Sequence, residues 1–398
     1  MELWRFLPKG LRLSQTPSKA ASASLARSTF TAPGRVNLLG EHVDYTGGLV
    51  LPMAIPFATT VELRPAASTS DYTFESVGYP ETRSLSRFDR SPRDGSWSDY
   101  PVGVLRELQK LGIEPPPFTL HFHGNVPQGA GLSSSASIEV AAAMTLLACA
   151  DASLPLEEIA TLCQRAENLY VGSPCGVMDQ FVVTAATRGH ALLLNTRGLT
   201  YEHLPLDQDA FADCVFVVSN SGVRHSVATG DYGLRRRELE AGQAFLCERF
   251  HLRDLGEASL AQLNQCTATL SPESFRRCRH VISENQRVRK VCSALQTGKP
   301  EALGLAMTAS HISQRVDFEC SVEEIDLLVE TAVRLDGCFG SRLTGGGFGG
   351  CTVSLVLANF AEAFSQQLAR TYQQRFDRTL ETYICAASDG AVALAQGA

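Results

Sequence analysis

A glycine- and serine-rich segment, residues 127–137 (Pro-Gln-Gly-Ala-Gly-Leu-Ser-Ser-Ser-Ala-Ser), separates two stretches of opposite patterning. Before it, residues 118–126 alternate apolar and polar side chains like a half-buried strand; after it, residues 138–150 are alanine-rich and favour a helix. Glycine lets backbone N–H groups approach a ligand, and a helix N-terminus attracts anions. We therefore predict a phosphate-binding loop. A turn that only caps the helix is the alternative.

The segment does not match the common nucleotide-binding signatures. It lacks the pattern G-x-x-x-x-G-K-[ST], and the chain lacks the protein-kinase motifs, which excludes both of those folds. A second glycine run, residues 344–350, contains G-x-G-x-x-G, but it precedes a strand near the end of the chain instead of opening a helix early in a dinucleotide domain. We interpret it as a loop passing close to a ligand or to the first loop, or as a plain hairpin connection.

Residues 34–45 combine several kinds of polar side chain beside an apolar strand. Glu41, His42 and Asp44 lie within four positions, and Tyr45 follows them. As metal ligands they lack a partner cluster elsewhere in the chain. A polyol fits them better, because each hydroxyl of a sugar both donates and accepts hydrogen bonds. A charged loop at a strand end, without a binding role, is the alternative.

Residues 172–180 (Gly-Ser-Pro-Cys-Gly-Val-Met-Asp-Gln) follow a predicted helix that carries Glu167. An acid in a loop with two glycines and a proline is a candidate for a partly buried, functional carboxylate, so Asp179 is singled out. Met178 and Cys175 are interpreted as packing residues.

Length and composition limit the class of protein. At 398 residues the chain exceeds what one hydrophobic core ordinarily serves, so two domains are expected. With 44% hydrophobic and 19% charged residues it has the composition of a folded globular protein. A net charge of −7 argues against nucleic-acid and acidic-membrane partners. The run Arg235-Arg236-Arg237 is interpreted as a solvated helix face.

Cysteine usage and apolar runs indicate a cytoplasmic protein. The 12 cysteines show neither C-x-x-C pairs nor zinc spacing, which predicts reduced thiols. The longest apolar helix candidate, residues 140–150, is far shorter than the ~20 residues that a membrane span needs. Residues 1–28, with one acid, faintly resemble a transit peptide but are interpreted as a variable N-terminal arm. We expect a monomer.

Mixed helical and strand patterns without a βαβ rhythm favour an α+β fold, with a domain boundary between residues 200 and 215. Strands are predicted at residues 36–39, 49–55, 118–126, 191–194, 215–219 and 351–357. Helices are predicted at residues 138–150 and 156–170 and within a helix-rich stretch, 234–335. Residues 65–71 and 91–98 are predicted surface loops, and a turn is predicted after residue 339.

Taken together and in this order, the four segments resemble the motifs of the GHMP kinase superfamily, and within it the galactokinase family. Residues 34–45 are similar to that family's sugar-binding motif, 129–137 to the phosphate loop, 175–180 to the catalytic-aspartate motif and 344–350 to the third motif. The resemblance covers residues 30–395. It implies a two-domain α+β fold, with a ribosomal protein S5 domain 2-like N-terminal domain (29–207), a ferredoxin-like-related C-terminal domain (208–398) and the active site in the cleft between them.

The same resemblance implies transfer of the γ-phosphoryl group of MgATP to the anomeric hydroxyl of galactose. Asp179 would be the base, with Arg35 beside it stabilising charge on the phosphoryl group. Ser135 and Glu167 would bind Mg²⁺. Sugar contacts are implied for Glu41, His42, Val43, Asp44, Gly176 and Tyr232. Nucleotide contacts are implied for Gly129, Ala130, Gly131, Leu132, Ser133, Ser134 and Ser135, with Trp97 near the adenine.

Two other functions remain open at this point. One is a related anomeric kinase acting on N-acetylgalactosamine, arabinose or galacturonate, since the size of the pocket near C2 and C6 decides between these sugars. The other is a non-catalytic galactose sensor of the same family. Such sensors have a shortened phosphate loop, whereas residues 134–137 are complete here and Arg35 and Asp179 are both present.

Overall fold

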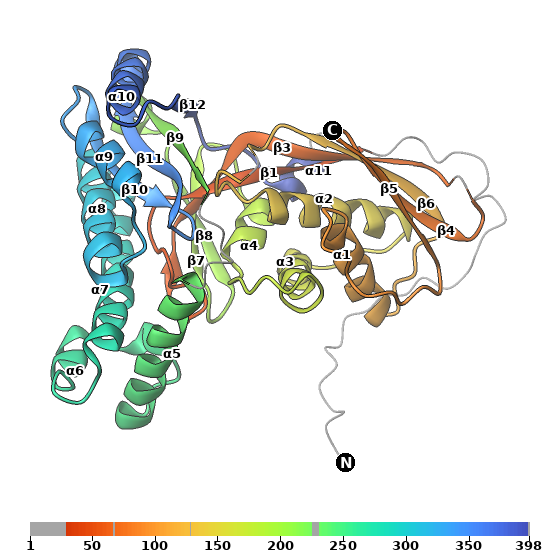
Figure 1. The fold of residues 1–398 in the computed structure, drawn as a ribbon, viewed down its shortest axis with the longest axis horizontal. Coiled ribbons are helices and arrows are strands. Elements are labelled where there is room, and N and C mark those ends of the chain that lie inside the picture. Colours follow the sequence, from red (N-terminus) through yellow and green to blue (C-terminus); the bar gives the residue numbers. More distant parts are fainter. Residues whose placement is uncertain (1–28, 67, 128, 225–230, 397–398) are drawn as a thin grey trace.

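The computed structural model describes residues 29–66, 68–127, 129–224 and 231–396, so the predicted arm, residues 1–28, lies outside the described residues. The chain forms two halves, and one end of the first half meets the side of the second (Figure 1). One half contains β1 and β3–β6 with α1–α4, and the other contains β9–β12 with α5–α10. The predicted α+β class is confirmed.

The first half is built on a five-stranded sheet in the order β1-β3-β6-β4-β5, in which only β4 and β6 are parallel. Helix α2 packs on β1 and β3, and α1, α3 and α4 pack around α2. The strands are β1 (Thr29–Asn37), β3 (Pro52–Pro65), β4 (Asp71–Ser76), β5 (Tyr79–Ser86) and β6 (Phe118–Gly124). The helices are α1 (Asp99–Lys110), α2 (Ser134–Cys149), α3 (Leu156–Arg165), η1 (Ala166–Val171) and α4 (Met178–Ala185).

The second half is built on an antiparallel sheet in the order β10-β11-β9-β12. Its strands are β9 (Cys214–Arg224), β10 (Cys338–Thr344), β11 (Gly349–Leu357) and β12 (Glu381–Cys385). Its larger helices are α5 (Asp231–Phe250), α7 (Pro272–Gln296), α8 (Pro300–Ser313), α9 (Glu323–Ala332) and α10 (Ala361–Phe376). Shorter elements are η2 (Asp209–Phe211), η4 (Leu255–Glu257), α6 (Leu260–Asn264), η5 (Gln314–Phe318) and η6 (Ala358–Phe360).

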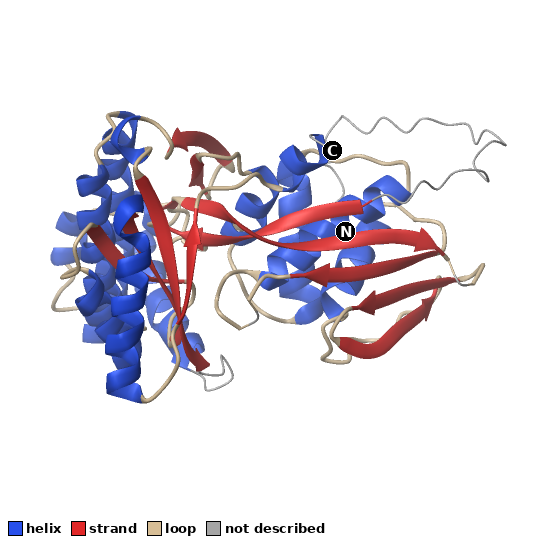
Figure 2. Ribbon diagram, turned by 90° about the horizontal axis from the view of Figure 1, so that it is seen from above, coloured by secondary structure: helices blue, strands red, loops and turns tan. Residues whose placement is uncertain are grey.

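Several elements tie the halves together. The long antiparallel pair β1 and β3 runs from one half toward the other (Figure 2). A small sheet of β2 (Leu49–Val50), β7 (His190–Asn195) and β8 (Thr200–Pro205) lies beside α7. After β12 the chain returns to the first half, where α11 (Ala391–Gln396) packs on β1 and α4.

Some element predictions were wrong in detail. The strand predicted at 36–39 is the end of β1, and the chain bends after Asn37. The helix predicted at 156–170 ends at Arg165 and continues as the π-helix η1. The turn predicted after residue 339 is strand β10, whose alternation is masked because Ser341, Arg342 and Thr344 are buried polar residues.

The arginine run on α5 is not simply a solvated face. The Arg236 guanidinium lies 4.8 Å from the centre of the Tyr45 ring, and its Nη1 donates to the carbonyl of Pro174 at 3.4 Å. Arg235 pairs with Glu238 and Glu319. The run therefore helps to attach α5 to the loops that precede α4.

Helix α8 lies against β10 so closely that glycine is required at the contact. A Cβ atom on Gly304 would lie 2.2 Å from the carbonyl oxygen of Phe339, which is backbone and cannot turn away. We expect Gly304→Ala to lower the free energy of unfolding by ~1–3 kcal/mol despite the better helix propensity of alanine, as overpacking does. Urea denaturation measures this.

The matched control is Gly198→Ala, because a Cβ atom there would meet only a Thr200 methyl group at 4.0 Å. We expect that variant to unfold at the same urea concentration as the unaltered protein. Equal midpoints for both variants would contradict the close packing of α8 on β10.

Candidate active site

The centre of the site is an ion pair between Arg35 on β1 and Asp179 in the first turn of α4. The Arg35 Nε donates to Asp179 Oδ1 at 2.7 Å and its Nη2 to Oδ2 at 2.5 Å. The Ser133 hydroxyl also donates to Oδ2. The Arg35 side chain is 7% exposed and that of Asp179 24%, so the arginine is buried behind a carboxylate that solvent reaches. This arrangement fixes the orientation of the acid and leaves it accessible to a ligand.

The predicted phosphate loop lies directly on this ion pair. The Arg35 Nη1 donates to the carbonyl of Gly131 at 2.6 Å, and the Arg35 backbone N–H donates to the carbonyl of Leu132 at 3.1 Å. The loop fits closely because residue 34 is glycine: a Cβ atom there would lie 2.7 Å from the Leu132 oxygen. Ser133 adopts a left-handed conformation at the start of α2, and its hydroxyl binds Asp179 instead of capping the helix.

The second glycine run lies beside the first loop. It connects the antiparallel strands β10 and β11, and a Cβ atom on Gly345 would be 3.2 Å from the carbonyl oxygen of Gly131. The Thr344 hydroxyl bonds to the backbone N–H of Asn37 at 3.0 Å. The run is therefore both a hairpin connection and a neighbour of the phosphate loop, which brings both interpretations of it together.

A cavity of about 680 Å³ opens beside the phosphate loop. Gly129, Ser134 and Ser135 line one part of it, and Trp97 and Tyr79 line another. The Trp97 ring contacts Phe122 edge-on, with ring centres 5.3 Å apart. A cavity that joins helix-start donors to an aromatic wall has the shape and chemistry to take a nucleotide.

A cluster of buried acids lies behind the serines. Glu167, in the first turn of η1, accepts hydrogen bonds from the Ser135 hydroxyl and, at 2.7 Å, from Gln180 Nε2. The same Gln180 nitrogen donates to Glu139 at 3.0 Å. Burial and, to a smaller extent, the charge of Asp179 raise the pKa of Glu167 to about 7. Burial also raises the pKa of Glu139 well above its usual range.

The predicted sugar segment packs against the loop before α4. A Cβ atom on Gly176 would lie 1.9 Å from the Asp44 carboxylate, so only glycine admits that acid. Burial raises the pKa of Asp44 to about 6, and the neighbouring charge of Asp179 raises it too. The carboxylates of Asp44 and Asp179 are thus close enough for the charge of one to affect the other.

His42, within the predicted sugar segment, lies next to Tyr232 on α5. The His42 ring stacks on Phe318 with centres 4.1 Å apart, and the Tyr232 ring lies 5.9 Å away. The Tyr45 hydroxyl lies 3.2 Å from His42 Nδ1. Burial lowers the pKa of His42 well below its usual range, so its imidazole is neutral and its buried Nε2 has no protein partner within the described ranges. Val43 is fully buried and packs in the core.

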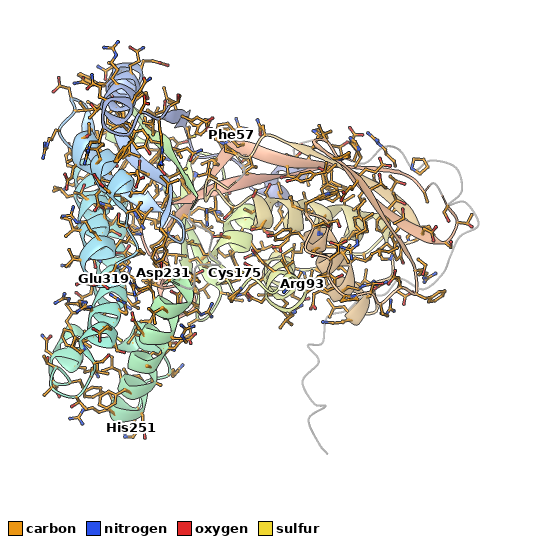
Figure 3. The ribbon with its side chains drawn as sticks, viewed as in Figure 1. Phe57, Arg93, Cys175, Asp231, His251 and Glu319 are labelled. Carbon is orange, nitrogen blue, oxygen red and sulfur yellow. The ribbon has the colours of Figure 1, made fainter. Side chains whose placement is uncertain are left out.

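Residues from both halves of the molecule lie close together at the loop before α4. Figure 3 shows Cys175 and Asp231, at the start of α5, near each other where the halves join, in agreement with the bond from Arg236 to Pro174.

Within the part of the chain that is described, no three His, Cys, Asp or Glu side chains are grouped to hold a metal, and no helix is long and apolar enough to span a membrane. All 12 cysteines are free thiols.

Comparisons with known proteins agree with this geometry. The galactokinase galactose-binding signature matches residues 21–65, the GHMP kinases N terminal domain residues 99–187 and the GHMP kinases C terminal domain residues 292–374. Galactokinases of Roseiflexus sp. and Homo sapiens are 41% and 38% identical, over 90% and 92% of this chain and 91% of each relative. The chain belongs to the galactokinase family.

Solved structures of other proteins share the fold of this chain. The crystal structure of Lactococcus lactis galactokinase complexed with galactose is 30% identical with a TM-score of 0.87, covering 92% of this chain and 95% of that chain. The Methanococcus jannaschii mevalonate kinase, 19% identical with a TM-score of 0.64 over 92% of this chain and 99% of that one, shares the fold.

Sequence reasoning missed several residues that shape this galactokinase-family site. Arg342 and Glu284 are fully buried and reach the segment that carries Glu41, and Gln180 links two acids. The sequence gives a weak indication of Arg342, because this residue is a lone charge two residues before the glycine run. Glu284 has none, because it lies among many charged residues of α7.

The shifted pKa of Asp44 makes a stability prediction. Its folded-state pKa of about 6 exceeds the ordinary value of 3.8, so its contribution to stability is fully present below pH 3.8 and is lost as the pH rises through about 6. Asp44→Asn removes the buried charge and keeps an acceptor for the Met178 N–H. We expect the variant to unfold at a temperature higher by at least ~2 °C near pH 8.

Near pH 4 the two proteins should unfold at the same temperature, because Asp44 is then largely protonated. Calorimetric melting at both pH values measures the difference. A variant that is less stable near pH 8 would show that Asp44 is not a destabilising buried charge.

Proposed function

We propose that this protein is a galactokinase that transfers the γ-phosphoryl group of MgATP to the anomeric (C1) hydroxyl of D-galactose, giving galactose 1-phosphate and ADP. One observation carries the proposal: the Asp179 carboxylate, held by Arg35 and Ser133, lies where the phosphate loop meets the sugar segment. The relatives named galactokinase and the galactokinase solved with galactose support the choice of substrate.

In the proposed reaction Asp179 is the general base. The C1 hydroxyl of the sugar takes the place of the Ser133 hydroxyl at Oδ2 and gives its proton to the carboxylate. The C1 oxygen forms a bond to the γ-phosphorus as the bond to the bridging oxygen of ADP breaks. Arg35 lies between Asp179 and the phosphate loop, where its charge stabilises the transferring group.

ATP would bind with its phosphates on the loop at residues 129–135 and its base in the cavity toward Trp97. The backbone at Gly129, Ala130, Gly131 and Leu132 approaches the phosphates, and Ser133, Ser134 and Ser135 open α2. Aromatic rings at one end of the cavity suit a purine, which binds by stacking.

Ser135 and Glu167 are the proposed residues for Mg²⁺. Their oxygens are the hard donors that this ion prefers, and Glu167 is a buried acid whose charge is opposed by burial and by the charge of Asp179, so a cation beside it would be favourable. The neighbouring oxygens Glu139 Oε1 and Gln180 Oε1 are buried without a protein partner within the described ranges. When bound, the ion would neutralise charge on the phosphates.

The sugar would lie between Asp179 and the segment at residues 41–44. Asp44 and Glu41 accept bonds from its hydroxyls, the neutral His42 offers Nε2, and Gly176 and Tyr232 bound the pocket. Related sugars, N-acetylgalactosamine, arabinose and galacturonate, remain competing substrates. The galactose sensor is disfavoured because the serines and both catalytic residues are in place.

The free thiols suit a reducing compartment, and we place the enzyme in the cytoplasm. A monomeric state stays a prediction.

The function is tested by measuring ADP release with galactose, glucose, N-acetylgalactosamine, arabinose and galacturonate side by side. We expect kcat/KM to be highest for galactose, because the galactokinase galactose-binding signature matches residues 21–65, which include the acids of the sugar segment. A higher value with another sugar would reassign the substrate, and binding without turnover would favour the sensor.

The base is tested with Asp179→Asn. We expect kcat to fall by at least ~10²-fold, the usual loss for a general base, while ATP affinity stays nearly unchanged. Stopped-flow or coupled assays measure kcat, and calorimetry measures ATP binding.

The matched control is Asp326→Asn, since Asp326 also lies in the first turn of a helix, is paired with a basic partner and has a side chain 25% exposed. This control should keep its turnover. Turnover close to that of the unaltered enzyme in Asp179→Asn would remove Asp179 from the catalytic role.

A further inference from the structure

Glu41 is bound by a fully buried arginine that comes from the other half of the molecule. The Arg342 Nη2, on β10, donates to Glu41 Oε2 at 2.6 Å, with exposed fractions of 0% and 5% for the two side chains. Asn37 Nδ2 donates to the same oxygen at 3.1 Å. Both bonds use Oε2, so Oε1 is the oxygen that a sugar hydroxyl would meet.

A buried glutamate holds the backbone of the same segment. Glu284 Oε1, on α7, accepts from the Gly40 N–H at 2.9 Å and from the Ser310 hydroxyl at 2.6 Å. Arg342 Nη1 lies 3.7 Å from that oxygen. Glu284 and Arg342 therefore contact each other as well as two successive residues of the sugar segment.

The sugar segment needs such support because its backbone is unfavourable. His42, which is not glycine, has φ 60°, whereas the φ of 93° at position 40 is accommodated because that residue is glycine. A non-glycine residue with positive φ persists only where its surroundings hold it. Here the surroundings include His280 Nε2, which lies 3.1 Å from the Glu41 carbonyl.

We propose that Arg342 and Glu284 are positioning residues for galactose binding: Arg342 orients the Glu41 carboxylate so that one oxygen faces the sugar, and Glu284 holds the Gly40–Glu41 backbone that carries it. The role rests on the proposed function, because it presupposes that the segment binds galactose. Among the described residues, neither side chain makes a hydrogen bond or ion pair with residues 129–135, so nucleotide binding should not depend on them.

The charge of Arg342 also affects how Glu41 titrates. Burial raises the pKa of Glu41 to about 7, and Arg342 opposes this rise more than Arg35 does. Galactose affinity should fall at low pH, as Glu41 takes up a proton, and this fall is called the acid limb. Removing Arg342 should therefore move the acid limb to higher pH. The titratable and charged groups that face Glu41 are Arg35 on β1, Asp44 on the same segment, Asp179 on α4, His280 and Glu284 on α7, Cys320 after η5, and Arg342 on β10.

The test is calorimetric binding of galactose and, separately, of ADP to the full chain and its variants across pH 5 to about 9. For Arg342→Gln we expect galactose Kd to rise ~10-fold or more, as for loss of a charge-assisted hydrogen bond, with the acid limb shifted to higher pH. ADP Kd should change by less than ~2-fold, the scatter of independent sites. Arg342→Lys should restore the acid limb but only part of the affinity, because lysine keeps the charge without the planar fork.

Glu284 provides a second series that keeps the test open if Arg342→Gln does not fold. Glu284→Gln retains an acceptor for the Gly40 N–H, whereas Glu284→Ala does not. We expect galactose Kd to rise more in the alanine variant. The control is Glu107→Gln, since Glu107 is 4% exposed and pairs with Arg165 in the first half. It should leave galactose binding unchanged.

The outcomes separate this role from the proposed function. Absence of galactose binding by the unaltered protein would overturn the proposed function and this role with it. Normal galactose binding by the unaltered protein and by every variant would overturn the positioning role alone. Equal losses of galactose and ADP affinity, without a shift of the acid limb, would show a purely structural contribution and also overturn it.

Discussion

The bidentate ion pair between Arg35 and Asp179 is the interaction on which the site depends. It joins β1 to α4, and the same guanidinium donates a hydrogen bond to the Gly131 carbonyl of the phosphate loop. An arginine is suited to this task because its planar fork makes several bonds in fixed directions without losing its charge. The position of the acid relative to the phosphate loop therefore follows from one side chain on β1.

The rest of the site gathers acids where burial opposes their ionisation. Burial raises the pKa of Glu41, Asp44 and Glu167, and each group has only limited compensation from basic neighbours. Such an arrangement costs stability in the free protein. It is consistent with a site whose ligands, a cation and a polyol, supply the missing charge and hydrogen bonds when they bind.

Much of the site could be predicted from short segments. The glycines and serines at 129–135, the acid at 179 and the polar residues at 41–44 stand close together within their own motifs, and each motif has a local physical signature. Strands β4 and β5 and helix α1 were not predicted: β5 lies at the sheet edge and is polar and exposed except at Leu85, whereas β4 and α1 bury apolar residues in patterns that were overlooked. Strand β10 was hidden by its buried polar residues, which pair only in the folded protein.

The sequence by itself determined the family, the α+β class and the motifs whose chemistry is local, because backbone freedom, helix capping and side-chain charge act over a few residues. Tertiary structure alone decided which residues meet across long separations: Arg35 with Asp179, Asp44 with Gly176, and Glu41 with Arg342. These contacts depend on how β1, α4 and β10 pack around a shared core. A local pattern of residues carries no record of such a distance, so only the fold could bring them together.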